Sequence, residues 1–143
     1  MRNTIITFFV LGFTSCLPEG LSEKEVALSR GAQVVIEKYK ALYEAKHVEI
    51  VHLEGENSIN ALAINIIDAR SIPDNMGEKR AISHQIASDI FISLDKEITD
   101  KIEIVDFGFK QTQSELLTYT KSSIDRYRFI HSKLKLIPAF SSN

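Results

Sequence analysis

Two short segments of similar sequence, 48–53 (VEIVHL) and 102–107 (IEIVDF), most strongly constrain the fold of this chain. Each alternates apolar and polar residues as half-buried β-strands do, and each follows a stretch with apolar residues at helical spacing. An offset of 54 residues, from Ile50 to Ile104, aligns the two segments. The sequence therefore predicts two helix-strand-strand units, which are either a true duplication or two independent segments of similar pattern.

Apolar periodicity predicts two helices, over about 22–45 and 77–97. The first is expected to begin at a capping box, Ser22-Glu23-Lys24-Glu25, in which the serine and the last glutamate satisfy free backbone amides. The second places four apolar residues on one stripe of its surface: Ile82, Ile86, Ile90 and Leu94.

Strands are predicted at 48–53, 59–67 and 102–109, with a further short one at 116–120. The segment 123–136 is compatible with two structures. Ile124, Tyr127, His131 and Leu134 fit one face of a helix, whereas residues 126–129 alternate like a strand. We favour a fifth strand followed by a terminal turn.

The predicted fold is α+β, with two layers: an antiparallel sheet of four or five strands and two helices on one of its faces. A chain of 143 residues suits a single domain, which we place at 22–137, with a frayed tail at 138–143. Short hairpin connections favour antiparallel neighbours whether or not the two units are a duplication.

The composition excludes several classes of protein. The formal net charge is −2, so the chain lacks the basic excess that nucleic-acid binding requires, and no nucleic acid is expected as a partner. One cysteine cannot build a disulfide scaffold. An apolar content of 44% excludes a fully disordered chain.

The first residues follow the pattern of an export signal. Arg2 precedes an apolar run from Ile5 to Phe13, and the small polar residues Thr14 and Ser15 come next. The run is shorter than the roughly 20 apolar residues that a transmembrane helix needs. The only cysteine, Cys16, stands where the run ends.

The sequence Phe13-Thr14-Ser15-Cys16 resembles the lipobox of bacterial lipoproteins. The resemblance implies a signal peptide at 1–15, cleavage before Cys16, attachment of lipid to this cysteine, and a tether at 16–21. It also implies a membrane-anchored lipoprotein of the bacterial cell envelope that faces the periplasm or the exterior. The alternatives are an ordinary secretory signal with an incidental cysteine, or a buried apolar strand.

Both faces of the predicted sheet are partly apolar, although two helices can cover only one. In the strand at 48–53, Val51 and Leu53 point away from Val48 and Ile50. In the strand at 102–109, Ile102 and Ile104 oppose three other residues: Val105, Phe107 and Phe109. We expect Val51, Leu53 and these three to form an interaction surface, covered by the chain's own tail, by a second copy in a homodimer, or by another partner or ligand.

The segment near the C-terminus is locally basic. Arg126 and Arg128 alternate with Tyr127 and Phe129, a pattern that suits contact with anionic lipid headgroups or with an acidic partner. The same cations are also typical of an edge strand, where they discourage edge-to-edge pairing.

Candidate catalytic residues are few. The 54-residue offset aligns His52 with Asp106, and if the two strands were neighbours this pair could serve a small-ligand-binding or hydrolytic site. Alternatively, both are partly exposed polar residues at strand ends. The four histidines lack metal-ligand spacing, so we expect no metal and no cofactor. The sequence favours a non-enzymatic interaction module.

Overall fold

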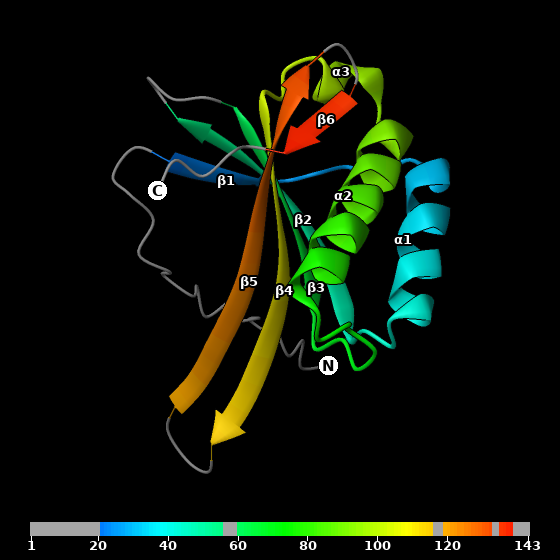
Figure 1. Cartoon of the computed structure of the whole chain (residues 1–143). Helices are drawn as coiled ribbons and strands as arrows, with labels where there is room; N and C mark the ends of the chain where they lie inside the picture. Colours follow the sequence, from blue (N-terminus) through cyan, green and yellow to red (C-terminus); the bar gives the residue numbers. More distant parts are fainter. Residues whose placement is uncertain (1–20, 56–59, 116–118, 133–134, 139–143) are drawn as a thin grey trace, which may run out of the picture.

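The computed structural model of this chain describes residues 21–55, 60–115, 119–132 and 135–138. Their elements are, in chain order, β1 (Leu21–Glu25), α1 (Arg30–Leu42), β2 (His47–Gly55), β3 (Ala61–Ile67), α2 (Met76–Ser93), α3 (Lys96–Thr99), β4 (Ile104–Glu115), β5 (Tyr119–Ser132) and β6 (Lys135–Pro138). The two long helices lie together on one face of a twisted sheet (Figure 1). The predicted α+β class, with two helices against one sheet face, is confirmed.

The sheet contains six strands in the order β1-β2-β3-β4-β5-β6. All neighbours are antiparallel except β3 and β4, which pair in parallel from Ala61↔Ile104 to Ile67↔Lys110. The prediction of a purely antiparallel sheet was therefore wrong. Helix α2 occupies the connection between β3 and β4 and brings the chain back to the same end of the sheet, which is how parallel neighbours are joined.

The first helix begins later than predicted, and its capping box is not used. Residues 21–25 form β1, which pairs with β2 from Leu21↔Gly55 to Glu25↔Val51. The helix is capped by Ser29, whose hydroxyl accepts a hydrogen bond from the backbone N–H of Ala32 at 3.2 Å. Ser29, and not Ser22, stands directly before the helix whose buried residues are Ala32, Ile36 and Tyr39.

The second helix agrees closely with its prediction at the start and ends earlier. Asn75 caps α2 by accepting hydrogen bonds from the backbone N–H groups of Gly77 and Glu78, at 2.8 and 3.1 Å. The helix stops at Ser93, and a separate short helix, α3, follows. The residues between α2 and β4 therefore form a compact corner instead of one longer helix.

The segment 123–132 is a strand, as we favoured, but it is part of β5, which already begins at Tyr119, so 119–120 form no separate strand and 116–118 lie outside the described residues. The expected terminal turn is replaced by β6. Strand β5 pairs with β4 over a long ladder, from Ile104↔Ile130 to Glu115↔Tyr119, and β6 then adds to β5. Because β3 ends opposite Lys110, the outer part of the β4–β5 ladder is a two-stranded ribbon that extends beyond the rest of the sheet (Figure 1). Of the predicted tail at 138–143, only Pro138 lies within the described residues.

The two helix-strand-strand units are present in the chain order, as α1-β2-β3 and α2-β4-β5. Their strands run in different senses, however. Strand β2 is antiparallel to β3, which is parallel to β4, so β2 and β4 run in opposite directions. The second unit is therefore not a simple translational copy of the first within the sheet.

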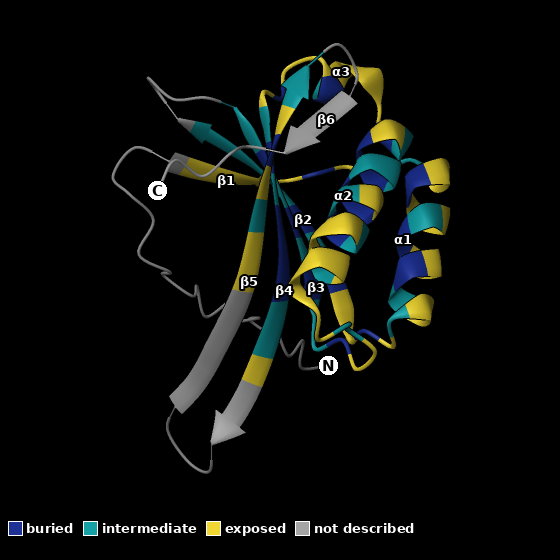
Figure 2. Cartoon of the chain, viewed as in Figure 1, coloured by how far each residue is buried: buried dark blue, intermediate teal, exposed yellow. Residues whose placement is uncertain are grey.

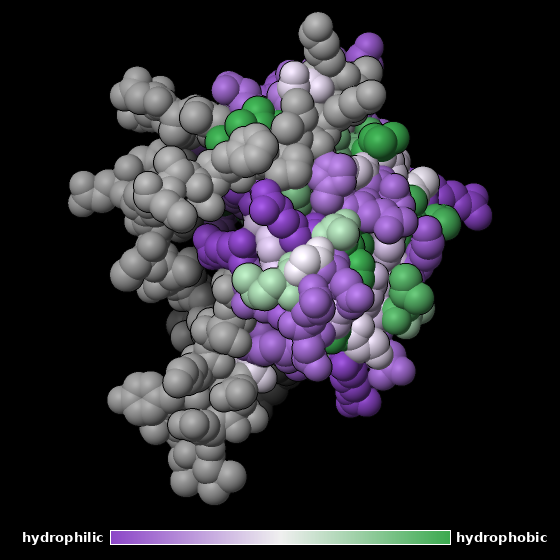
Figure 3. All heavy atoms as spheres, viewed as in Figure 1, coloured by the Kyte–Doolittle hydropathy of each residue, from purple (hydrophilic) through white to green (hydrophobic). Residues whose placement is uncertain are grey.

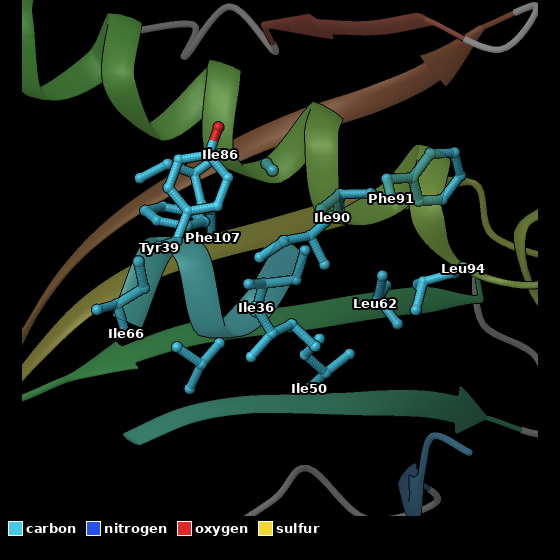
Figure 4. Close-up of a cluster of buried hydrophobic side chains, with 14 of the residues drawn as sticks. Ile36, Tyr39, Ile50, Leu62, Ile66, Ile86, Ile90, Phe91, Leu94 and Phe107 are labelled. Carbon is cyan, nitrogen blue, oxygen red and sulfur yellow. The ribbon is translucent and has the colours of Figure 1, made fainter. Parts of the chain in front are cut away.

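The core lies between the helices and the sheet. Helix surfaces that face the strands are buried and the outer surfaces are exposed (Figure 2). Side chains from α1, α2, β2, β3 and β4 point into one apolar cluster, in which Tyr39, Ile90, Leu62 and Phe107 take part (Figure 4). Each large side chain buried in this way contributes about 1.5–3 kcal/mol relative to an exposed one.

Candidate functional site

The face of the sheet opposite α1 and α2 carries no helix in the described part of the chain, and we call it the open face (Figure 1). Side chains alternate along a strand, and paired residues share a face. Because Leu62, Ile64 and Ile66 are buried against the helices, the alternate residues of β3 point to the open face. Three rows of paired residues cross the open face from β2 to β5. The first row is Leu53, Ala61, Ile104 and Ile130; the second row is Val51, Ala63, Asp106 and Arg128; the third row is Glu49, Asn65, Gly108 and Arg126. On β1, Glu23 pairs with Leu53 of the first row and Glu25 with Val51 of the second.

The first row of the open face is apolar across four strands. Leu53 is half-buried, and Ile130 at the other end of the row is 47% exposed. The helices also expose single apolar residues, among them Val34, Leu42 and Ile92. In the view of Figure 3, hydrophobic patches on the helix side are interspersed with hydrophilic ones. Apolar residues scattered singly are normal on a protein surface, whereas a continuous row marks a candidate contact surface.

Charge is separated across the open face. Glu23, Glu25 and Glu49 lie on β1 and β2, whereas the cations Arg126 and Arg128 lie on β5. A further acidic residue of this face, Asp106 on β4, is paired with Arg128. Among the described residues, neither Glu23 nor Glu25 nor Arg126 takes part in an ion pair. The face therefore has an acidic side and a basic side, and part of its charge is available for a partner.

Two contacts between side chains order the middle of the open face. The Arg128 guanidinium donates two hydrogen bonds to the Asp106 carboxylate, from Nε to Oδ1 at 2.7 Å and from Nη2 to Oδ2 at 2.8 Å. The hydrogen bonds and the negative charge of Asp106 raise the pKa of Arg128. On the other side, the Asn65 amide donates to Glu49 Oε2 at 3.0 Å. These pairs hold one cation and one anion in fixed positions.

The structure divides the predicted interaction residues between the two faces. Val51 and Leu53 lie on the open face, as predicted. Val105, Phe107 and Phe109 lie on the helix side, where they are at most 2% exposed. They therefore belong to the core and are not available to a partner. Strand β4 pairs in parallel with β3, which places Val105 beside the buried Leu62 and Ile104 on the open face.

The hypothetical pair of His52 and Asp106 does not form. His52 pairs with Leu62 and points to the helix side, whereas Asp106 pairs with Ala63 and points to the open face. The strand β3 also lies between them. The sheet separates the two side chains, so they cannot act together in one site.

His52 has a different partner. Its Nδ1 lies 3.5 Å from Oε1 of Glu54, and Lys24 of β1 forms an ion pair with the other oxygen of the same carboxylate. The hydrogen bond from Lys24 is the main cause that lowers the pKa of Glu54. The Nε2 atom of His52 is buried and has no hydrogen-bond partner within the described residues. This cluster ties β1 to β2, and its contacts are structural.

The basic residues Arg126 and Arg128 are both exposed. Strand β6 pairs with β5 only from Phe129 to Ser132, so both arginines precede the part of β5 that has a described neighbour on its outer side. Cations at such a place discourage edge-to-edge pairing. They can also contact an acidic partner, because their side chains lie on the open face.

The expectation of a helix at 22–45 does not predict the acidic side of the open face, because only a strand places Glu23 and Glu25 on one face of a sheet. In β1, Glu23 and Glu25 point to the open face and Lys24 points to the other side, because they alternate along a strand. The alternation Glu-Lys-Glu was the available signal, although three residues are a short pattern. Glu49, on β2, was the third acidic residue that the sequence analysis did not single out.

Cys16 and the leader lie outside the described residues. Within the described ranges, no helix combines the length and the apolar character needed to cross a membrane. The same part of the chain contains no cluster of three or more histidine, cysteine, aspartate or glutamate side chains that could hold a metal ion. Comparison with models of protein families, with curated proteins and with solved structures finds no match to this chain.

Proposed function

We propose that this chain is a lipid-anchored protein of the bacterial cell envelope whose α+β domain acts as a non-enzymatic interaction module. Its contact surface is the open face of the sheet. The observation that carries this proposal is the continuous apolar first row, Leu53 to Ile130, next to charges of both signs. Protein interfaces combine an apolar centre with polar and charged surroundings in this way.

The proposed anchor rests on the leader. A cation at Arg2, an apolar run to Phe13 and a cysteine at position 16 support export followed by lipid attachment. Two or more acyl chains on one residue make membrane binding stable, because each buried methylene contributes about 0.8 kcal/mol. The segment from Cys16 to Gly20 would then separate the lipid from β1, which begins at Leu21.

The interaction surface is tested by placing a charge in the first row. Ile130→Asp is compared with Ile92→Asp, because both residues are exposed isoleucines, one on the open face and the other on α2. Each variant is expressed in a bacterial host as the full chain, and its neighbours are crosslinked in the envelope and identified. We expect Ile130→Asp to lose partners, including copies of the chain itself, that Ile92→Asp keeps. Equal capture by both variants would refute the proposed surface.

The anchor is tested by metabolic labelling with a radioactive fatty acid. Wild type should take up the label and Cys16→Ser should not. A matched control adds Ser22→Cys to Cys16→Ser, which restores one cysteine outside the lipobox-like sequence. Label in this control, or no label in wild type, would contradict lipid attachment at Cys16.

A further inference from the structure

The separation of charge on the open face makes this face complementary to itself in one orientation. Glu49 lies on β2 and Arg126 on β5, while Arg128 of β5 is already paired with Asp106, so two copies attract each other through Glu49 and Arg126 when β2 of one faces β5 of the other. Most homodimers are related by a two-fold axis, and every contact in such an interface then occurs twice. A second copy of the chain therefore carries the charges that complement this face.

The orientation of the axis follows from the strand order. Two sheets stacked face to face lie about 10 Å apart, with strand directions within about 30° of each other. A two-fold axis between the sheets, parallel to the strands and above the junction of β3 with β4, places β3 over β4 and β2 over β5 of the second copy. An axis perpendicular to the strands would instead place each strand over itself, so the acidic strands β1 and β2 would face each other and would not meet Arg126.

The register of the strands then matches residues of suitable chemistry. In the first row, Leu53 lies over Ile130 of the second copy, and Ala61 lies over Ile104. In the third row, Glu49 lies over Arg126. The first row therefore brings apolar residues together, and the third row brings Glu49 of each copy to Arg126 of the other. In the second row, Val51 lies over Arg128 and Ala63 over Asp106, so each Asp106–Arg128 pair keeps its partner within its own copy.

Small residues at the middle of the open face allow this approach. Ala61 and Ala63 of β3 and Gly108 of β4 lie beside the proposed axis. Glycine in a strand interior often marks a position where another backbone comes close. Each small residue is paired with a larger one across the β3–β4 junction, namely Ile104, Asp106 and Asn65, and Val51, Leu53 and Ile130 lie to either side of this centre.

We infer that the partner of the open face is a second copy of this chain, in a homodimer with its two-fold axis along the strands of the sheet. This inference rests on the proposed function, because it names the partner of the same surface. The first row supplies the apolar contact, and the two Glu49–Arg126 contacts select the orientation. In a protein attached at residue 16, two anchors on one dimer would also strengthen membrane binding by making the second attachment intramolecular.

The test uses charge reversal in the chain from residue 16 to 143, which retains every described residue, with Cys16→Ser to prevent disulfide dimers. Sedimentation velocity measures the dissociation constant of the dimer. Arg126→Glu and Glu49→Arg, each alone, place like charges at both contacts and should weaken the dimer about tenfold or more. Mixed together, the two variants should form a heterodimer, because both of its contacts are then attractive. Glu37→Arg on the exposed side of α1 is the control and should dimerise like wild type.

The dimer can also be tested with wild type alone, so the result does not depend on whether the variants fold. Its dissociation constant should rise as the salt concentration rises from about 0.05 to 0.5 M, because salt screens the exposed charges. A chain that remains monomeric up to about 100 μM, or a dimer that neither charge reversal nor salt weakens, would overturn the inference. A monomer whose own residues 139–143 or 16–20 cover the open face would be one form of the first outcome.

Failure of this inference differs from failure of the proposed function. If the chain is monomeric but Ile130→Asp still abolishes the capture of another envelope protein, the open face is an interaction surface for a different partner and the homodimer is rejected. If the chain is monomeric and Ile130→Asp changes nothing, both are rejected. If the dimer forms and the mixture of charge-reversal variants restores it, both are supported.

Discussion

Asp106 on β4 and Arg128 on β5 face each other across an antiparallel pair and share two hydrogen bonds, of 2.7 and 2.8 Å. The Asp106 side chain is 18% exposed and the Arg128 side chain is 60% exposed, so water screens the attraction between them. The two bonds are parallel, which gives the pair a defined geometry in addition to its attraction.

We predict a coupling of about 0.5–1 kcal/mol between these two side chains, typical of an exposed pair with good geometry. The double-mutant cycle of Asp106→Asn, Arg128→Gln and both together measures it by urea denaturation at a fixed protein concentration. The coupling should decrease at high salt. A coupling of zero at low salt would show that the two bonds contribute nothing to stability.

A second prediction separates the core from the open face. Phe107 is 1% exposed and lies among buried residues of α1 and α2, so Phe107→Ala should lower the free energy of unfolding by about 3–5 kcal/mol. Val51→Ala, on the open face, should cost about 1 kcal/mol or less. Chemical denaturation of both variants provides the comparison. Similar losses for the two would contradict the assignment of Phe107 to the helix side.

A third prediction concerns stability at high pH. Burial, together with a hydrogen bond to Asp89 of α2, raises the pKa of Tyr39 well above its ordinary value of 10.0. A group whose pKa is raised on folding contributes its stabilisation fully below its unfolded pKa. Stability should therefore fall as the pH rises above about 10, while the unfolded chain ionises and the folded chain does not.

Tyr39→Phe tests this prediction. It should lower stability at neutral pH by about 1–3 kcal/mol, because a hydrogen bond to a carboxylate is lost, and it should reduce the loss of stability above pH 10. Asp89→Asn keeps a polar acceptor and removes the charge, so it should reduce the alkaline loss to a smaller extent. Urea midpoints between pH 8 and 11 measure both effects, and curves for Tyr39→Phe and wild type that stay parallel would exclude Tyr39 as the cause.

Apolar periodicity predicted those helices and strands in which the pattern of apolar residues lies within the element itself. The alternation in 48–53 and the apolar stripe around Ile86 and Ile90 each lie within one segment, and both elements are present. Strand β1 was missed for the opposite reason. It is five residues long and mostly charged, and it owes its conformation to β2, more than twenty residues further along the chain, which the local pattern does not contain.

The residues of the candidate site depend on how β4 pairs with β3, which the sequence of one strand does not encode. The alternation in 102–109 was read correctly, but which of its two faces meets the helices depends on the register with β3. One parallel pairing therefore moved Phe107 and Phe109 into the core and brought Ile104 and Asp106 to the open face. The pair His52 and Asp106 came from the 54-residue offset and required β2 and β4 to be neighbours, whereas β3 lies between them.

The parallel junction of β3 with β4 also bears on the order in which the chain assembles. The hairpins β2–β3 and β4–β5 join strands that are close in sequence, so each can form early and independently. Their union is a non-local event, because β4 finds β3 only after the whole of α2 has folded back against the sheet. We therefore expect the closure of this junction to limit the rate of folding, and the two sides of the open face to come together only in that last step.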